Sequence, residues 1–339
     1  MPLGERPEPR IVGSVSPEEK EKVRQIVINN FREGRPEGIS EKILRELEAL
    51  EYKKEDWERE VIDSANTKLG KLRASLGLEQ FNIPEKNILI LPADQYEKAV
   101  DDNDTFGTAF NKYQIAAINA TKIRANPLQM AKTMIHEMTH LEGYYAFEAE
   151  EENGDFSSHR TGLAMAKTVK GARRATEGHF PLMFGGLNEA VVEDIAKSVL
   201  LDIREENEKL SDEVRRVDKF AKEKEAVAKK RKIPVEEVFW VSGDGKEGST
   251  YSYYAQREIL RLLVEAISED SGETPEQVKQ KFYKAFFSGR VVELGRLVEK
   301  SFGKGAFREL GMMRSSDDGT AWSIMDSFKK KRRLLGFKK

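Results

Sequence analysis

The sequence predicts an α+β protein that is predominantly helical. Over most of the 339 residues, apolar side chains recur at the three-to-four-residue spacing of a buried helix face. Strand-like composition is confined to a short part of the chain after Pro84. There, residues 88–91 form a dense apolar run and residues 106–118 suggest a hairpin. A chain of this length is typical of about two domains, or of one domain with additions.

Breaks in this pattern divide the chain into four regions. We expect a flexible tail at residues 1–14, because this stretch has three prolines and no periodicity. An N-terminal helical region follows at 15–83, and the strand-like segments fall in a core region at 84–270. Residues 271–339 are expected to form a helical C-terminal lobe with a basic tail.

The expected helices follow from the apolar spacing, taken in chain order. Gly34, Pro36 and Gly38 separate the first two helices, and Asn126-Pro127 supplies a cap and a first-turn proline for the first core helix. Residues 204–232, rich in both charges, are expected to continue the preceding helix as an exposed one. The helices are centred on or span 23–31, 43–50, 57–69, 127–142, 188–206, 204–232, 252–268, 274–287, 290–301 and 320–334.

The composition excludes several classes of protein. Lys and Arg number 57 against 59 Asp and Glu, so we do not expect a nucleic-acid binder, which needs an excess of positive charge. The chain has no cysteine, which excludes disulfides, cysteine-based zinc fingers, iron–sulfur clusters and a catalytic thiol. No apolar run approaches the ~18–20 residues of a membrane span, and the N-terminus lacks a secretory apolar segment. We therefore expect a cytoplasmic protein, with a non-classical route of export left open; no pattern indicates an oligomeric state.

The clearest chemical motif is His136-Glu137-Met138-Thr139-His140. On a helix, residues four apart lie one turn apart on the same face, so the two imidazoles can hold one ion together. Zinc suits nitrogen and carboxylate ligands in a tetrahedral site. Glu137, next to the first ligand, is placed to accept a proton from a metal-bound water. The alternative is a pair of histidines that are merely buried in a core.

A catalytic zinc site needs a third protein ligand. The third-histidine position of one HExxH pattern is occupied here by Ala146, which cannot bind a metal. A better candidate lies 49 residues after His140, where Glu189 and Glu193 stand one helical turn apart. One of them can bind the metal while the other accepts a hydrogen bond from a ligand imidazole. The alternative is a solvated acidic helix face.

With Asn188, these residues resemble the gluzincins, the thermolysin-like zinc metallopeptidases. The family pattern is His-Glu-x-x-His on one helix and Asn-Glu-x-x-x-Asp/Glu on a later one. The resemblance covers roughly residues 85–270 and implies a zincin-like catalytic core. It further implies three zinc ligands, a general base and an outer carboxylate that supports a ligand histidine. These are His136, His140 and Glu189 for zinc, Glu137 as the base, and Glu193 as the supporting carboxylate.

Peptide hydrolysis also needs a group that stabilises the oxyanion of the tetrahedral intermediate. Many gluzincins use a Tyr or His after the second motif, and no histidine follows His179 here. Tyr251, Tyr253 and Tyr254 cluster before an apolar helix, and we prefer Tyr253. Simple aromatic packing at a helix start is the alternative. The family resemblance also makes the edge of the 106–120 hairpin a rail for an extended peptide substrate.

The sequence thus predicts zinc-dependent hydrolysis of peptide or protein substrates, with Zn²⁺ as the cofactor. Two other functions remain open. One is a zinc-binding protein that does not cleave peptides, and the other is a metal-free helical interaction protein that uses residues 204–232 and the basic tail. Glu142 lies too close to His140 on the helix to approach the same ion. Four further features are expected to be structural or solvated, namely the acidic run 148–155, His159, His179 and the basic tail 329–339.

Overall fold

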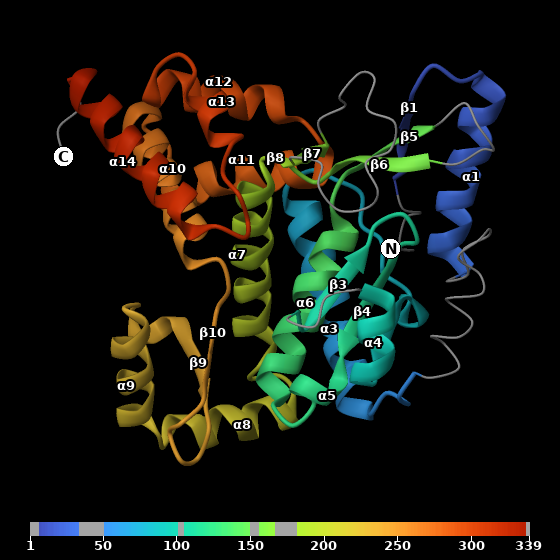
Figure 1. Cartoon of the computed structure of the whole chain (residues 1–339), viewed down its shortest axis with the longest axis vertical. Helices are drawn as coiled ribbons and strands as arrows, with labels where there is room; N and C mark the ends of the chain where they lie inside the picture. Colours follow the sequence, from blue (N-terminus) through green and yellow to red (C-terminus); the bar gives the residue numbers. More distant parts are fainter. Residues whose placement is uncertain (1–6, 34–50, 101–104, 150–155, 167–181, 337–339) are drawn as a thin grey trace.

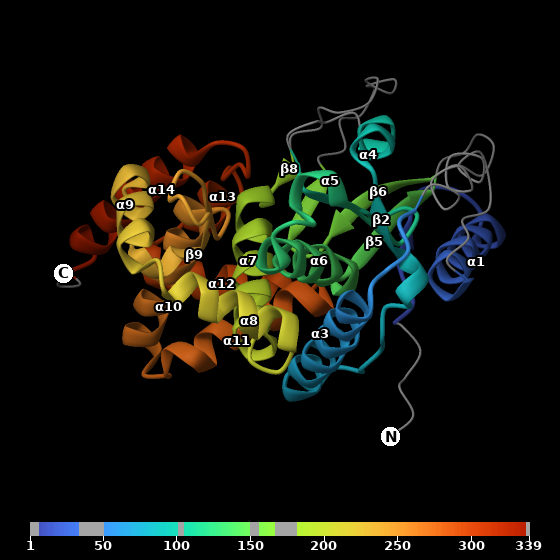
Figure 2. The same ribbon diagram turned by 90° about the horizontal axis from the view of Figure 1, so that it is seen from below.

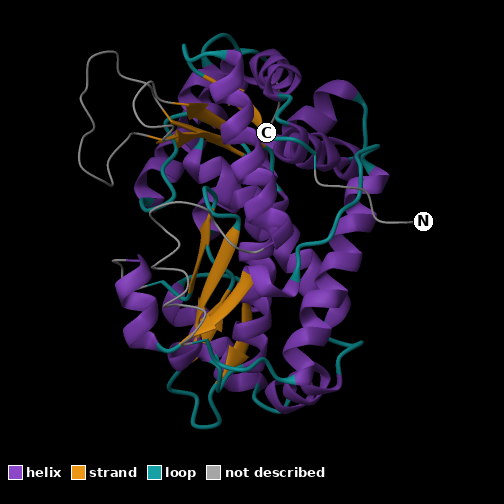
Figure 3. Cartoon of the chain, turned by 90° about the vertical axis from the view of Figure 1, so that its right-hand side faces the viewer, coloured by secondary structure: helices purple, strands orange, loops and turns teal. Residues whose placement is uncertain are grey.

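The computed structural model describes residues 7–33, 51–100, 105–149, 156–166 and 182–336. Helices make up most of this part of the chain, and the strands form separate small sheets between them (Figure 3). The predicted mixed and predominantly helical class is therefore confirmed.

Two buried helices form the centre of the molecule, α6 (Pro127–Glu142) and α7 (Gly185–Ile203) (Figure 1). They pack against each other, and α3 (Asp56–Ser75) packs against both. One continuous apolar core runs through these three helices and on into the C-terminal ones. On α3, the predicted apolar face is present, since Val61 and Leu69 are fully buried.

A three-stranded sheet in the order β2-β4-β3 lies beside α6. β2 (Ile88–Leu91) and β4 (Ile115–Asn119) are parallel and buried on both faces, which explains the continuous apolar run of β2. β3 (Gly107–Phe110) pairs antiparallel with β4 and occupies an edge of the sheet. The strand and the hairpin predicted in this region are both confirmed. The hairpin places its edge strand against α6.

A five-stranded sheet was not predicted. Its order is β1-β5-β6-β7-β8, and β1 (Arg10–Val12) pairs parallel with β5 (Tyr145–Ala149). The prediction of a flexible tail at residues 1–14 is therefore wrong for this strand, because Ile11 is buried in a small apolar cluster with Phe147. The other strands are β6 (Phe156–Thr161), β7 (Ala164–Ala166) and β8 (Leu182–Met183).

The C-terminal helices agree with their predicted positions to within a few residues. α10 packs on α7 and connects the centre of the molecule to the rest of this group. One short helix, α13, was not predicted. The helices are α10 (Tyr254–Ser271), α11 (Pro275–Ser288), α12 (Val291–Phe302), α13 (Ala306–Leu310) and α14 (Asp318–Leu334).

The prediction of one exposed helix over residues 204–232 is wrong. The segment forms two helices, α8 (Glu208–Asp218) and α9 (Ala221–Arg231). α7 ends first, and the Asn207 side chain then accepts a hydrogen bond from the Leu210 N–H at 3.1 Å, which starts α8. A hairpin of β9 (Val238–Val241) and β10 (Gly248–Thr250) follows and leads back to α10.

The remaining helices lie at the periphery. α1 lies at one end of the molecule, and α9 and α14 lie at the opposite end (Figure 2). The helix predicted at 43–50 falls outside the described residues. Among the helices that are described, none has the length and apolarity needed to cross a membrane. The remaining helical elements are α1 (Pro17–Glu33), α4 (Ala93–Val100), α5 (Ala120–Ile123) and the 3₁₀ helices 85–87 and 235–237.

Candidate metal centre

Helix α6 begins where the sequence predicts. The Asn126 side chain accepts a hydrogen bond from the Gln129 N–H at 3.0 Å, and Pro127 occupies the first turn. The helix is buried almost throughout, so its apolar side chains fix its rotation against the surrounding elements. His136 and His140 consequently lie one turn apart, and their side chains meet residues of α7.

Three ligand atoms converge between α6 and α7. The Nε2 atoms of His136 and His140 lie 3.3 Å apart. The Oε2 atom of Glu189 lies 3.4 Å from the first and 3.2 Å from the second. Within the described residues, these three side chains form the cluster suited to holding a metal ion.

The dimensions of this triangle fit zinc. Ligand atoms at about 2.0–2.1 Å from a tetrahedral zinc lie about 3.3 Å from one another. The three observed separations, 3.2 to 3.4 Å, match that value on every side. Two imidazoles and one carboxylate are also a zinc donor set, whereas calcium and magnesium prefer oxygen ligands throughout. A fourth position remains for water or a substrate oxygen.

The electrostatics of the cluster favour a bound cation. Burial lowers the pKa of His136, but hydrogen bonds with Glu189 and Glu193 outweigh it and raise that pKa to about 9. Burial would raise the pKa of both carboxyls. The positive charge of His140 beside Glu189, and of Lys132 beside Glu193, holds each carboxyl pKa well below its usual range instead. Two ionised carboxylates therefore face the imidazoles, and this arrangement attracts positive charge.

Glu193 supports the cluster without joining it. Its Oε2 atom accepts a hydrogen bond from His136 Nδ1 at 2.7 Å, which leaves Nε2 free to bind a metal. The same oxygen lies 2.9 Å from Lys132 Nζ, and Oε1 accepts the Ser252 N–H at 2.7 Å. The fully buried carboxylate is thus held by three donors, two on α6 and one in the loop before α10.

Glu193→Ala should weaken zinc binding without abolishing it. Loss of an outer carboxylate that orients a ligand histidine typically costs about 10–100-fold in metal affinity. Competition against a chromophoric zinc chelator measures the change, and Glu193→Asp, which keeps the acceptor but shortens its reach, should fall between wild type and Glu193→Ala. Zinc lost from Glu193→Ala but retained by Glu189→Ala would reverse the two roles.

Glu137 lies under the edge strand β3. A Cβ atom added to Gly107 would lie 2.9 Å from Cγ and 3.0 Å from Oε1 of Glu137, so only glycine allows the strand to approach this closely. Burial raises the pKa of the Glu137 carboxyl, against the opposing influence of the two histidines. A carboxylate whose pKa is raised by burial is a stronger proton acceptor, which is what a general base requires.

Gly107→Ala should therefore disturb this contact. The added Cβ would lie 2.6 Å from Thr133 Cγ2, and overpacking of this kind costs about 1–3 kcal/mol of stability. Thr133→Ser removes that methyl group but keeps the hydroxyl, so it should restore part of the loss when combined with Gly107→Ala. Urea unfolding of the single and double variants measures both effects. A Gly107→Ala protein as stable as wild type would contradict the tight contact.

Of the three candidate tyrosines, Tyr253 lies at the cluster. Its ring stacks on His136 with centroids 5.9 Å apart, and its phenol lies within the electrostatic influence of Glu189. The negative charge of Glu189, together with burial, raises the pKa of the phenol well above its usual range, so it stays a donor. Tyr251 packs on Phe239 and Tyr254 on Trp322, away from the metal ligands.

The backbone at Tyr253 is strained. Its φ of 56° is in the left-handed region, which costs a residue with a side chain about 1–2 kcal/mol. Such a conformation persists only when the surroundings enforce it. Tyr253 is also the residue that immediately precedes α10, so the strained position aims the phenol at the start of the helix toward the cluster.

Lys132 and Ser252, near the cluster, were not predicted from the sequence, and Asn188 entered the prediction only as part of the family motif. Asn188 directs its amide toward Glu189 Oε1 at 3.5 Å and accepts the Leu163 N–H at 2.9 Å. Lys132 and Ser252 join the network around Glu193. For Lys132 a signal was present, because it lies four residues before His136 and hence on the same helix face. Ser252 gave no signal, since only the folded chain brings it there.

The other candidates lie apart from the cluster. Glu142 is fully buried beside Arg73, at 3.4 Å. His159 lies on β6, 3.8 Å from Glu148. Glu148 belongs to strand β5, and its assignment to a solvated loop is therefore wrong. His179 and the acidic residues 150–155 lie outside the described residues.

The basic C-terminal segment is partly neutralised. Arg332 pairs with Asp270 at 2.7 Å and with Glu269 at 2.8 Å, and Lys331 pairs with Glu309. Two of its cations therefore hold α14 to neighbouring elements rather than facing solvent alone.

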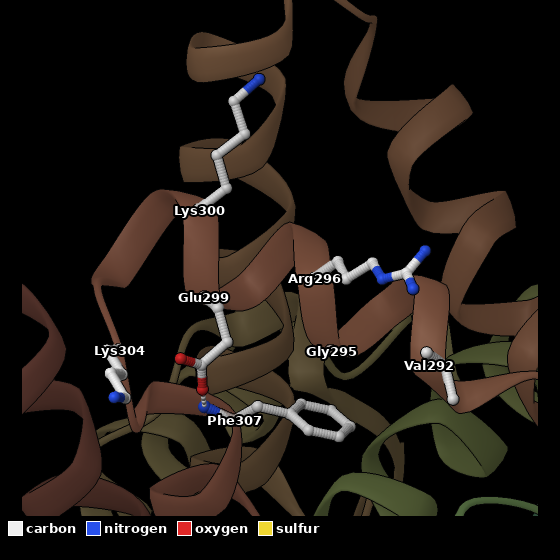
Figure 4. A pocket seen from close by; sticks show the side chains of 7 residues that line it. All are labelled: Val292, Gly295, Arg296, Glu299, Lys300, Lys304 and Phe307. Atoms are coloured by element: carbon white, nitrogen blue, oxygen red, sulfur yellow. Dashed lines mark hydrogen bonds between the residues drawn. The ribbon is translucent and has the colours of Figure 1, made fainter.

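A separate surface hollow of about 610 Å³ lies between α12 and α13. Its cationic side chains, Arg296, Lys300 and Lys304, point in different directions (Figure 4). Glu299 instead accepts the N–H groups of Gly305 and Phe307, at 2.7 and 2.9 Å, so its carboxylate is committed to the start of α13. The hollow therefore has no converging polar groups of the kind a ligand site needs.

No family model, no curated protein and no solved structure matches this chain. The functional assignment therefore depends on the chemistry of the cluster itself.

Proposed function

We propose that this chain is a zinc-dependent peptidase of the gluzincin type, with a zincin-like core built around α6 and α7. The observation that carries the proposal is the triangle of His136, His140 and Glu189, whose ligand atoms are spaced as the edges of a zinc tetrahedron. The hydrogen bond from His136 Nδ1 to Glu193 supports it, because ligand histidines in metalloproteins are regularly fixed in this way.

Bound zinc supplies a Lewis acid that polarises a carbonyl and lowers the pKa of a water molecule. The side chains of the chain supply the rest. The Glu137 carboxylate accepts the proton of the attacking water and later returns it to the leaving amine. The Tyr253 hydroxyl, held as a donor beside Glu189, donates to the oxygen on which negative charge develops.

The edge strand β3 provides a rail for the substrate. An extended peptide can pair with an exposed strand edge through main-chain hydrogen bonds, which are independent of its side chains. β3 is held firmly, since the single hydroxyl proton of Tyr145 is shared between the His140 carbonyl at 2.6 Å and Asn111 Oδ1 at 3.1 Å. Asn111 follows β3 in the hairpin, so these bonds tie the hairpin to the end of α6. A peptide on this edge would pass directly over Glu137.

The test is the metal content and activity of the purified chain. Protein prepared without added metal should contain close to one zinc per chain and should cleave a mixture of unstructured peptides. Chelation should abolish cleavage, and added zinc should restore it. Chelation should also lower the Tm, because a ligand that is present at about 100 times its Kd adds about 2.7 kcal/mol of stability.

The results separate the competing functions. Stoichiometric zinc without cleavage of any peptide would indicate a metal-binding protein without peptidase activity. A chain with no zinc, whose Tm is unchanged by zinc or chelator, would indicate a metal-free interaction protein and overturn the proposal.

A further inference from the structure

Ser252 is held at three points by buried charged side chains. Its N–H donates to Glu193 Oε1 at 2.7 Å, and its hydroxyl accepts from Lys132 Nζ at 2.9 Å. Its carbonyl accepts from Arg257 Nε, also at 2.9 Å. All three charged residues are less than one-tenth exposed. Every polar group of this loop residue is therefore fixed by a side chain from the molecular interior.

Fixing Ser252 fixes the residue that follows it. Tyr253 has a left-handed backbone, and it stacks on His136. Left to itself, a tyrosine would leave this conformation for an ordinary one, and the phenol would then turn away from the cluster. The hydrogen bonds to Ser252 oppose that movement, because they hold the backbone immediately before the strained residue.

We propose that Lys132 is a positioning residue, which couples the metal cluster to Tyr253 by holding Ser252 and Glu193 with the same ammonium group. The inference rests on the proposed function. It adds a physical link between Glu193, which supports the zinc ligand His136, and Tyr253, the proposed oxyanion donor. Lys132 is suited to the task because an ammonium has three donors and reaches both partners at 2.9 Å.

A simpler role for Lys132 is to neutralise the charge of buried Glu193. The contact with Ser252 distinguishes the two roles. Charge neutralisation needs only the Lys132–Glu193 pair, and its loss would act on His136 and hence on zinc affinity. Positioning needs the Ser252 contact as well, and its loss would move Tyr253.

The experiment places 3-fluorotyrosine at position 253 and records its ¹⁹F NMR signal with and without zinc. The variants are Lys132→Met, which keeps most of the length of the side chain but removes the ammonium, and Ser252→Ala, which removes only the hydroxyl. Lys122→Met, at an exposed lysine of α5, is the matched control for the loss of one charge. Zinc affinity and peptide hydrolysis are measured for each variant without the fluorine label.

Lys132→Met and Ser252→Ala should both move the fluorine signal toward that of a solvent-exposed tyrosine, in the zinc-free and the zinc-loaded protein. Lys122→Met should not. kcat should fall by up to about 10²-fold in Lys132→Met, since displacement of a catalytic group by about 1 Å can cost that much. KM should be unchanged. In the Tyr253→Phe background, Lys132→Met should cause no further loss, because both changes act through the same hydroxyl.

An unmoved fluorine signal in both variants would overturn the proposal, as would a loss of zinc affinity in Lys132→Met with the signal unchanged. If Lys132→Met fails to fold, Ser252→Ala decides the matter alone. Failure of the proposed function gives a different result from failure of the positioning role. A wild-type protein that binds zinc but cleaves nothing still reports the position of Tyr253 through the fluorine signal.

Discussion

Glu137→Gln is expected to retain zinc and to lose most of its peptidase activity. Glutamine has nearly the same shape as glutamate, so the contact with Gly107 of β3 should survive. An amide cannot accept the proton of the attacking water, and general base catalysis is worth about 10²–10⁴-fold. We therefore expect kcat/KM to fall by that factor, while zinc content and Tm stay close to the wild-type values.

The zinc measurement is the internal control for Glu137→Gln. Activity that falls together with zinc content would mean that the substitution has damaged the metal site, and Glu137 would then not be identified as the base. Undiminished hydrolysis by a zinc-loaded Glu137→Gln protein would show that another group takes the proton.

Glu189→Ala is expected to have the largest effect on the metal. It removes one of the three proposed protein ligands, and two imidazoles on one helix face hold zinc far more weakly than a complete set. The loss of zinc affinity should exceed the loss of about 10–100-fold that is typical when a supporting residue is removed. Hydrolysis should be lost together with the metal. Zinc titration monitored by calorimetry measures the change directly.

Asp202→Ala is the matched control for Glu189→Ala. Asp202 is an exposed acidic residue on the same helix, so its removal also takes one negative charge from α7. It should leave zinc affinity close to that of wild type. A Glu189→Ala protein that binds zinc as tightly as Asp202→Ala would exclude Glu189 as a ligand.

The helices of this fold could be predicted because their apolar spacing is local. The five-stranded sheet could not, for the opposite reason. Its strands are short, and β6 has the mixed sequence Phe-Ser-Ser-His-Arg-Thr, without a regular apolar alternation. Its first pairing joins Arg10 to Ala146, so the partner of β1 lies in a remote part of the sequence. Strand pairing over such a distance depends on the tertiary fold.

The same distinction applies to the site. His136 and His140, and likewise Glu189 and Glu193, lie four residues apart on single helices, so each pair could be recognised by spacing alone. Among the three clustered tyrosines, Tyr253 could only be preferred, because the direction of its side chain depends on a left-handed backbone that the sequence does not indicate. The contacts of Ser252 depend on how the start of α10 meets α6 and α7, and no local pattern encodes them.

The order in which the site residues occur along the chain has a consequence for biogenesis. The proposed zinc ligands end at Glu189, whereas Tyr253 lies 64 residues later and reaches the cluster only when α10 docks on α7. At about 5–20 residues per second, a ribosome needs about 3–13 s to synthesise that interval. A nascent chain would therefore carry a complete set of metal ligands for several seconds before its oxyanion donor emerges. If the proposed peptidase function holds, metal uptake and the onset of proteolysis would be separated in time, which would limit cleavage of the chain's own unfolded segments during synthesis.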